Sequence, residues 1–331
     1  MTTPLISIVI PTFNRLGVLR GCLELLQVQT FRDFECIVVD NGPSTDGTGE
    51  FVRSLEAGDP RFRLMEMGPA GCVVARNTGF AASAASILMT LDDDVRLADA
   101  DTLAYVHRTM KAHPEIGVLG IAEVHADAAQ GERRTTRPAG RLRRMRDTTL
   151  HPPGLVSRWG AIGTRFQHLE PGRLHDVDHV RSSAMAVRRD AFDAAAGLFE
   201  PYTALGYGYR YETELCVQVK RRGFRVVYST EGPLATHLAA ERARGWSREG
   251  RSRDYVYYTS RNNTLFFLRN SWRGAGSALF MTWDLAVGSS AQPGLLRLAL
   301  GRGRSLPAVK WAVTGKLEGW RMYQRYGPAG S

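Results

Sequence analysis

The first 125 residues alternate short apolar runs with segments of helical character, and this alternation limits the folds open to the chain. Strands that alternate with helices form parallel sheets, because each helix returns the chain to the same edge. The predicted strands are Ile6 to Phe13, Phe34 to Val39, Phe62 to Met67, Ile87 to Leu91 and Gly117 to Val124. The predicted helices are Leu16 to Gln27, Asp46 to Leu55, Val73 to Ala85 and Asp101 to His113. The sequence therefore predicts an α/β fold with a mostly parallel central sheet flanked by helices.

The pattern changes after residue 125. From Ala126 to Gly172 the chain is rich in Gly, Pro and Arg, with seven arginines between Arg133 and Arg146, which indicates a long surface excursion of unassigned role. A strand at Val177 to Val187, a helix at Glu212 to Arg222 and a strand at Phe224 to Ser229 follow, and from about Arg251 the chain is predicted to be helical. We expect three parts, residues 1–125, 126–240 and 241–331.

Composition favours a folded cytoplasmic protein. Of the 331 residues, 44% are hydrophobic and 23% are charged, which disfavours disorder and multiple membrane spans. The four cysteines show none of the paired spacing of zinc sites or disulfide frameworks, as expected in a reducing cytoplasm. The N-terminus from Met1 to Leu5 lacks the features of a signal peptide.

The net charge of +10 comes entirely from the last part of the chain, where residues 241–331 hold 15 Lys and Arg against 5 Asp and Glu. A basic segment attracts nucleic acid, an anionic lipid surface or a phosphorylated substrate, or is simply a solvated face. Its most apolar stretch, Ala278 to Val287, contains Asp284 and is shorter than the ~20 residues of a spanning helix. We therefore expect either peripheral contact with the inner face of a membrane or a packed helical cap.

Three successive carboxylates, Asp92, Asp93 and Asp94, directly follow a predicted strand. Adjacent acids repel one another unless solvent or a hard divalent cation offsets the repulsion. Ligands of open parallel sheets bind outside the carboxyl ends of the strands, which is where these acids fall. Standing alone, the triplet is either an acidic solvated turn or a metal site.

Polar residues also end the first two strands. The first strand ends in Pro11, Thr12, Phe13, Asn14 and Arg15, and the second ends in Asp40, Asn41 and Gly42. A carboxylate at a strand end can accept hydrogen bonds from a base or a ribose hydroxyl. The alternative is a turn and helix cap formed with Ser44 or Asp46, and the two interpretations are compatible.

The chain resembles glycosyltransferase family 2. The resemblance rests on four motifs in the same order, Ser7-Ile8-Val9-Ile10-Pro11-Thr12-Phe13-Asn14-Arg15, Ile37-Val38-Val39-Asp40-Asn41-Gly42, Ala75-Arg76-Asn77-Thr78-Gly79 and Leu91-Asp92-Asp93-Asp94. They cover the first 100 residues and are specific in combination. One departure is Pro43, an additional residue in the turn after Asp40, which affects the local geometry but not the expected nucleotide role.

The resemblance implies a GT-A fold that binds a nucleotide diphosphate sugar of UDP, dTDP or GDP type. In this scheme Asp40 accepts from the base, Pro11, Thr12 and Arg15 line its pocket, and Arg76 faces the donor. Asp92 contacts ribose or sugar, and Asp94 ligates Mg²⁺ or Mn²⁺, which neutralises the departing diphosphate. The polar neighbours at these strand ends complete the predicted nucleotide and donor contacts, namely Asn14, Asn41 and Asp93.

A weaker resemblance extends into the second half and implies a catalytic base. Family members carry Glu-Asp-x-Asp-Leu where this chain has Tyr211-Glu212-Thr213-Glu214-Leu215, so the base falls on Glu212 and Tyr211 replaces an acid. A base is needed because an acceptor hydroxyl is a poor nucleophile. The alternative is that Glu212 and Glu214 only stabilise a helix N-terminus through its dipole.

Further positions are expected to serve the metal or the acceptor. By the resemblance, His237 completes the metal shell or contacts the diphosphate, and otherwise it is a structural histidine. The expected acceptor contacts are Met185, Tyr207, Tyr209 and Glu214. The segment His175 to His179 has metal-like spacing, but strand alternation would point its side chains to opposite faces.

These features predict an inverting, metal-dependent glycosyltransferase that acts on a lipid-linked sugar, a cell-surface glycan or a small natural product. Inversion follows from the resemblance alone. The alternatives are an inactive nucleotide-sugar binder, a nucleotidyltransferase and a nucleic-acid-binding protein. A nucleotidyltransferase usually carries a glycine-rich phosphate loop, which the first strand end lacks, and the acidic triplet argues against nucleic acid. The oligomeric state stays open.

Overall fold

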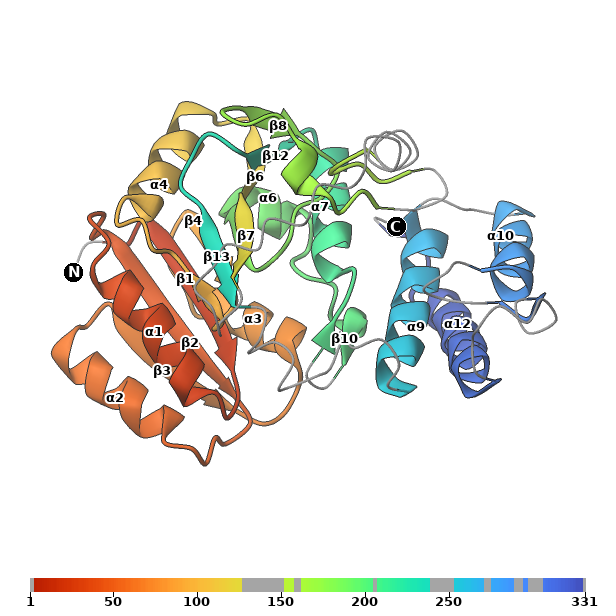
Figure 1. The fold of residues 1–331 in the computed structure, drawn as a ribbon, viewed down its shortest axis with the longest axis horizontal. Helices are drawn as coiled ribbons and strands as arrows, with labels where there is room; N and C mark the ends of the chain where they lie inside the picture. The colour runs from red at the N-terminus through yellow and green to blue at the C-terminus, as the bar shows by residue number, and fades with distance from the viewer. Residues whose placement is uncertain are drawn as a thin grey trace. The chain divides into compact units, whose positions relative to one another are not determined.

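Figure 1 shows the fold in the computed structural model, which describes residues 3–126, 152–157, 162–204, 207–238, 253–270, 275–288, 294–296 and 306–329. The arginine-rich excursion from Arg133 to Arg146 lies outside these residues. The chain divides into two compact units, one formed by residues 1–156 and 161–245 and the other by residues 157–160 and 246–331.

The first unit is built on an eight-stranded sheet in the order β3-β2-β1-β4-β9-β6-β12-β8. Its first half contains β1 (Ile6–Thr12), β2 (Phe34–Asn41), β3 (Phe62–Met67) and β4 (Ile87–Leu91). All of their pairings are parallel, with Thr12 beside Asp40 at the carboxyl end of the β1–β2 pair. The predicted strands of this half are confirmed to within two residues at each end.

The second half of the sheet is mixed. β6 (Ile116–Ile121) and β12 (Arg225–Ser229) pair in parallel, but β9 (Ala184–Arg188) is antiparallel to both β4 and β6, and β8 (Leu174–Asp176) is antiparallel to β12. The predicted strand from Val177 to Val187 is wrong in its first half, because only the end of that segment joins the sheet. The polar side chains that precede β9 bond outside it, as Asp178 does by accepting from the Val156 amide at 2.9 Å.

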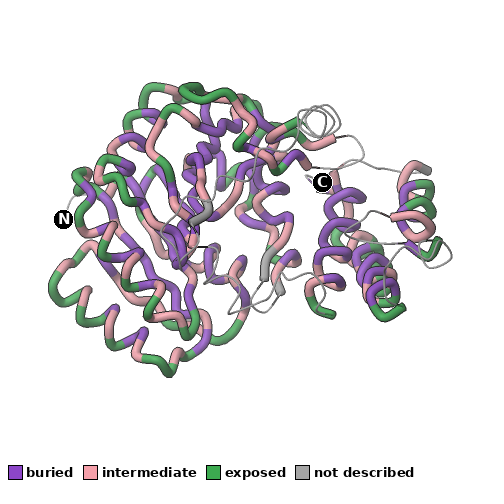
Figure 2. Tube along the Cα trace, viewed as in Figure 1, coloured by how far each residue is buried: buried purple, intermediate pink, exposed green. Residues whose placement is uncertain are grey.

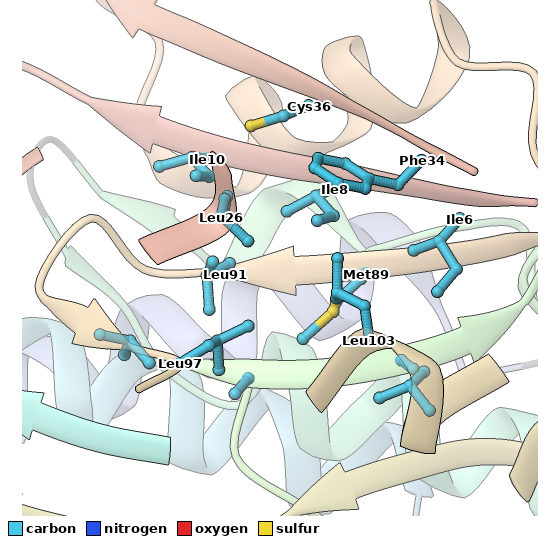
Figure 3. Close-up of a cluster of buried hydrophobic side chains, with 14 of the residues drawn as sticks. Ile6, Ile8, Ile10, Leu26, Phe34, Cys36, Met89, Leu91, Leu97 and Leu103 are labelled. Carbon is cyan, nitrogen blue, oxygen red and sulfur yellow. The ribbon is translucent and has the colours of Figure 1, made fainter. Parts of the chain in front are cut away.

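Helices cover both faces of the sheet because side chains alternate along each buried strand. The even-numbered residues of β1, Ile6, Ile8 and Ile10, pack in one cluster with residues of α1 (Leu16–Gln27) and α4 (Thr102–Ala112). Figure 3 shows part of this cluster. On the opposite face, α3 (Cys72–Ala81) contacts β1 and β2. The helices α2 (Thr48–Gly58), α6 (Arg189–Ala194) and α7 (Tyr211–Arg221) complete the regular helices described in this unit.

A second, three-stranded sheet lies beyond the carboxyl ends of β4 and β6. It has the order β5-β13-β7 and is formed by β5 (Val95–Arg96), β13 (Ala235–Leu238) and β7 (Glu123–Ala126). The single strand predicted from Gly117 to Val124 is thus divided between β6 and β7. This small sheet brings residues near position 237 to the turn that follows β4. A two-stranded ribbon of β10 (Thr203–Ala204) and β11 (Tyr207–Gly208) lies elsewhere in the unit.

The second unit contains the helices α9 (Arg253–Asn270), α10 (Ala275–Ala286) and α12 (Leu306–Tyr326). Two glycines of α12, Gly315 and Gly319, lie against the backbone of α9, where a Cβ atom would come within 2.5 Å of a carbonyl oxygen. Figure 2 shows the buried stripes of these helices. Among the residues that the structure describes, no helix is long and apolar enough to cross a membrane.

The close approach of α3 to the sheet gives a stability test. A Cβ atom at Gly79 would lie 2.5 Å from a Val9 methyl carbon and 3.1 Å from one of Val39. We expect Gly79→Ala to lower the free energy of unfolding by about 1–3 kcal/mol, because overpacking strains a close-packed core. Urea denaturation measures the change. Gly17→Ala in α1 is the control, since its Cβ meets nothing within 4 Å, and an equal loss there would contradict the explanation.

Candidate active site

Strand ends and a tight turn form the rim of the site. β1, β2 and β4 run in the same direction, so their carboxyl ends meet at one edge of the sheet. Directly after β4, the Asp92 amide donates to the Ser183 carbonyl at 3.0 Å, and the Val95 amide donates to the Asp92 carbonyl at 3.1 Å. These bonds fix the backbone of the acidic triplet on both sides.

Arg15 holds two members of the triplet. Its guanidinium lies 3.0 Å from a carboxylate oxygen of Asp93 and 3.1 Å from one of Asp94. Asp93 also accepts a hydrogen bond from the Thr12 hydroxyl at 2.9 Å. The two aspartates are each only 3% exposed, so this positive charge offsets repulsion that solvent cannot screen. The acidic solvated turn is therefore excluded, since the triplet is largely buried.

Burial has a strong effect on Asp93. Desolvation raises its pKa to about 7, with Arg15 lowering it and the charge of Asp94 raising it. Burial thus disfavours the charged form of Asp93, and Arg15 opposes this effect.

His237 approaches the triplet from β13. It pairs with Val95 of β5 in the small sheet, and the neighbouring Leu238 amide donates to the Asp94 carbonyl at 3.0 Å. Its Nε2 lies 3.4 Å from a carboxylate oxygen of Asp94, and the side chain is 2% exposed. The pairing of β13 with β5 therefore places His237, which was predicted to complete the metal shell, next to Asp94.

Asp92, Asp94 and His237 can hold a metal ion. One ligand atom from each lies within 4.8 Å of the other two, and this is the one such group of His, Cys, Asp or Glu among the described residues. Carboxylate oxygens suit Mg²⁺ and Mn²⁺, and a single imidazole is an accepted ligand of transition metals. The donor set therefore fits a divalent ion of this kind.

Arg76 holds the remaining carboxylate. It is 3% exposed in α3 and forms an ion pair with Asp92. Its guanidinium lies 5.4 Å from the ring centroid of Tyr211, and the Tyr211 hydroxyl bonds with that of Ser182. The sequence did not place Tyr211 in the site. Tyr211 stands where the family motif has an acid. In this chain the face of an aromatic ring, and not a carboxylate, therefore lies next to the Arg76 guanidinium at this position.

Glu212 lies in the first turn of α7, directly after Tyr211, whose ring centroid lies 5.4 Å from the Arg76 guanidinium. The role of Glu212 as the catalytic base stays a prediction.

Glu214 has a different environment. It is 3% exposed and accepts a hydrogen bond from the fully buried Tyr202 hydroxyl at 2.6 Å. Met185 is also fully buried, in β9 between β4 and β6. Glu214 and Met185, which were predicted to contact the acceptor, are therefore both buried inside the fold.

The aromatic residues predicted for the acceptor lie before α7. Tyr209 is partly exposed, and the guanidinium of Arg210 lies 4.8 Å from its ring centroid. Tyr207 belongs to β11, and its side chain lies outside the described residues.

The nucleotide side of the rim is organised by hydrogen bonds within turns. Asp40 is 1% exposed and accepts from the Ser44 hydroxyl at 2.7 Å and the Ser44 amide at 3.1 Å. Asn14 accepts from the Thr45 amide at 2.7 Å, and Asn41 accepts from the Ala70 amide at 3.0 Å. The turn is thus confirmed for Asp40 and Ser44, but the helix cap predicted on Ser44 or Asp46 is wrong, because the N-cap of α2 is Gly47, which forms no side-chain cap hydrogen bond. Pro11 is partly buried at the same strand end.

The segment from His175 to His179 is not a metal site. His175 bonds with the Glu170 carbonyl at 2.7 Å, and Asp176 pairs with Arg225 at 2.8 Å. His179 is buried with its ring 5.3 Å from that of Phe166, and burial lowers its pKa to about 3. The polar groups of His175, Asp176 and Asp178 are thus engaged in hydrogen bonds or ion pairs, whereas Nε2 of His179 is buried with no hydrogen-bond partner among the described residues.

Glu123 is a buried carboxylate that the sequence prediction did not include. It starts β7, is 2% exposed, accepts from the Ser183 hydroxyl and lies 3.3 Å from Arg181. Because the Ser183 carbonyl binds the Asp92 amide, Glu123 supports the segment that fixes the triplet. The only sign of Glu123 in the sequence is that an acid follows an apolar run, and this pattern alone does not identify a site residue.

Residues 7–194, more than half of the chain, match the sequence profile described as Glycosyl transferase family 2. The chain belongs to this family. The matched region contains the strand ends, Arg76 and the triplet, whereas Glu212 and His237 lie beyond it. The predicted family is confirmed.

Two of the curated relatives are several times longer than this chain. An uncharacterised protein of Sinorhizobium fredii is 27% identical over 263 residues, which cover 76% of this chain and 26% of the relative. The O-antigen biosynthesis protein RfbC of Myxococcus xanthus is 26% identical over 242 residues, which cover 72% of this chain and 18% of the relative. The chain therefore spans about a quarter or less of these relatives.

Solved structures show the same fold. The mannosyltransferase PcManGT of Pyrobaculum calidifontis, in complex with GDP-Man and Mn²⁺, has a TM-score of 0.53 at 16% identity, covering 98% of this chain and 88% of that chain. TarS 1–349 of S. aureus has a TM-score of 0.54 at 14% identity, covering 98% and 92%. The likeness confirms the predicted GT-A fold of this family 2 member.

The role of Arg15 can be tested without any substrate. We expect Arg15→Ala to lower the free energy of unfolding by about 2–4 kcal/mol in buffer containing EDTA, because it leaves Asp93 and Asp94 buried without their cation. Guanidinium denaturation measures the loss. Arg53→Ala is the matched control, since Arg53 and Glu66 form an exposed pair with a contribution of about 0–1 kcal/mol. Equal losses in both variants would show that Arg15 does not offset the buried charges.

Proposed function

We propose that this family 2 protein transfers a sugar from a nucleotide diphosphate donor to an acceptor hydroxyl with inversion at the anomeric carbon. The observation that carries the proposal is the group of Asp92, Asp94 and His237, whose ligand atoms lie within 4.8 Å of one another at the carboxyl ends of the sheet. Buried carboxylates gathered at a ligand-binding edge are costly unless they serve a bound cation or substrate.

The residues that would hold Mg²⁺ or Mn²⁺ are Asp92, Asp94 and His237. When bound, the ion supplies positive charge that offsets the charge of the departing diphosphate. Arg15 holds the Asp94 carboxylate at 3.1 Å, and Leu238 holds the Asp94 backbone, so the donor atoms are positioned by the protein itself. Preorganised ligands of this kind support metal binding because little rearrangement is needed.

The nucleotide is proposed to lie over the ends of β1 and β2. There, Asp40 and Asn41 offer acceptors to a base, and Pro11, Thr12 and Asn14 form the adjoining wall. Asp40 already accepts two bonds from Ser44, so that turn fixes its carboxylate before a ligand binds. Asp93, held by Thr12 and Arg15, adds to the donor side, and UDP, dTDP and GDP sugars are all candidates.

Arg76 is proposed to support the donor side through Asp92. Its positive charge lies in a buried setting between Asp92 and the face of Tyr211. A buried guanidinium fixed on two sides holds its partner carboxylate in one orientation. This orientation keeps Asp92 directed toward the metal group and the ribose or sugar.

Glu212 is the proposed general base. It lies in the first turn of α7, directly after Tyr211, whose ring centroid lies 5.4 Å from the Arg76 guanidinium. As the acceptor oxygen bonds to the anomeric carbon, Glu212 takes the hydroxyl proton. The bond from that carbon to the diphosphate oxygen breaks, and its electron pair leaves with the diphosphate. A single displacement from the opposite face inverts the anomeric carbon.

The acceptor is proposed to be a lipid-linked sugar, a cell-surface glycan intermediate or a small natural product. Support comes from the relative in Myxococcus xanthus, which is named for O-antigen biosynthesis. Residues 1–125 would then bind the donor and residues 126–240 the acceptor, with Tyr209 as a partly exposed aromatic contact. The helical residues 241–331 would form an extension, and a cytoplasmic location remains a prediction.

Nucleotide binding is the first test. Calorimetric titration of UDP, GDP and dTDP is expected to show one that binds with Mn²⁺ at least tenfold more tightly than in EDTA. Asp94→Ala should abolish that metal dependence, whereas Glu24→Ala on the exposed face of α1 should not. If no nucleotide binds while a DNA duplex does at low salt, the protein is instead a nucleic-acid binder.

Glu212 provides the test of chemistry. Glu212→Gln should keep nucleotide affinity within about twofold but slow release of the nucleotide diphosphate from the sugar donor by about a hundredfold or more. Glu212→Asp should retain part of the rate. Unchanged turnover in Glu212→Gln would assign the base elsewhere. A wild-type protein that binds donor but neither transfers nor hydrolyses it would be an inactive nucleotide-sugar binder.

A further inference from the structure

The helix α10 has an unusual distribution of polarity. Its residues, Ala275–Ala286, include a single charged side chain, that of Asp284. A helix on the surface of a globular protein normally turns its charged residues to solvent and its apolar residues inward. In α10 the charged residue is buried, and the exposed residues carry no charge.

The inner side of α10 is fully engaged within its own unit. Asp284 lies 2.7 Å from the Nζ of Lys316, which is fully buried, and accepts from the Thr264 hydroxyl at 3.0 Å. Phe280 packs on Phe267 of α9 with ring centroids 5.1 Å apart. These contacts to α9 and α12 fix which side of α10 points outward.

Large apolar side chains cover the outer side. Leu279 is 65% exposed and Trp283 is 60% exposed, and they are four residues apart, which places them on the same side of the helix. The residue before each of them, Ala278 and Thr282, is also exposed and uncharged. An exposed group of this kind marks an interaction surface.

Two more exposed leucines lie near the end of α10. Leu295 and Leu296 are 53% and 52% exposed. The Leu295 amide donates to the Leu285 carbonyl at 2.9 Å, so this short segment is tied to the last turn of the helix. We call Leu279, Trp283, Leu295 and Leu296 the α10 surface.

We propose that the α10 surface inserts into the headgroup region of an anionic membrane. Trp and Leu on one side of a helix are typical of helices that lie in the membrane interface. With 12 residues, α10 is too short to cross the bilayer, so it can only lie in the interface.

Charge favours a lipid surface over a protein partner. On α12 of the same unit, Lys310, Arg321 and Arg325 are exposed, and the single acid of that helix, Glu318, pairs with Arg321. Residues 241–331 also hold the entire surplus of positive charge of the chain. Basic residues in the unit that carries an apolar insertion surface strengthen its binding to anionic lipid. For a second copy of the chain, by contrast, the same charges would repel.

Vesicle binding by the full chain tests the proposal. We expect cosedimentation with vesicles of phosphatidylcholine and phosphatidylglycerol, and at least tenfold weaker binding to phosphatidylcholine alone or at high salt. The double variant Leu279→Glu, Trp283→Glu should lose at least tenfold in affinity for the anionic vesicles. Val28→Glu is the matched control, because Val28 is 61% exposed at the end of α1 in the other unit, and it should bind as the wild type does.

A conservative variant separates a loss of membrane insertion from a loss of folding. Trp283→Phe should keep the fold and vesicle binding but lose most of the fluorescence quenching caused by brominated lipid. Asp94→Ala should bind vesicles normally, so a failure of the nucleotide proposal is distinguishable from a failure here. Wild-type binding by the double glutamate variant, or no binding to any vesicle, would overturn the proposal. A concentration-dependent dimer lost in that variant, without vesicle binding, would assign the surface to self-association instead.

Discussion

The mutual repulsion of Asp92, Asp93 and Asp94 is the constraint on which the arrangement of the site depends. Two of the three carboxylates are almost fully buried, where like charges interact strongly. Two arginines from different elements offset them, Arg15 at the end of β1 and Arg76 in α3. The strand order matters here, because β1 and β4 must be neighbours for Arg15 to reach the triplet.

The rest of the site follows from what each arginine requires. Arg76 needs support in a buried position, and Tyr211 supplies it from the first turn of α7, the turn that also contains the proposed base Glu212. The turn after β4 continues into β5, and β5 pairs with β13, which delivers His237. A metal group and a candidate base are thus assembled by elements far apart in the chain.

The sequence predicted most of the first half of the fold, because buried parallel strands and amphipathic helices leave clear periodic patterns. It did not show that β9 is antiparallel, since an apolar strand has the same composition in either direction. Residue types at strand ends predicted which positions gather at the rim. They did not separate Glu212 from Glu214, because only the packing of α7 shows that Glu214 faces Tyr202. They also gave no sign that Tyr211 contacts Arg76.

The position of β9 has a consequence for synthesis of the chain. β4 and β6 leave the ribosome early, but in the sheet they are separated by β9, which comes from residues 184–188. Until that segment emerges, β4 has one unpaired edge and β6 lacks both of its neighbours, β9 and β12, and unpaired strand edges invite pairing with other chains. Residues 1–91 can form a parallel half-sheet first, and insertion of β9 then closes it. Translation arrested between β6 and β9 would therefore leave these strand edges open to pairing with other chains.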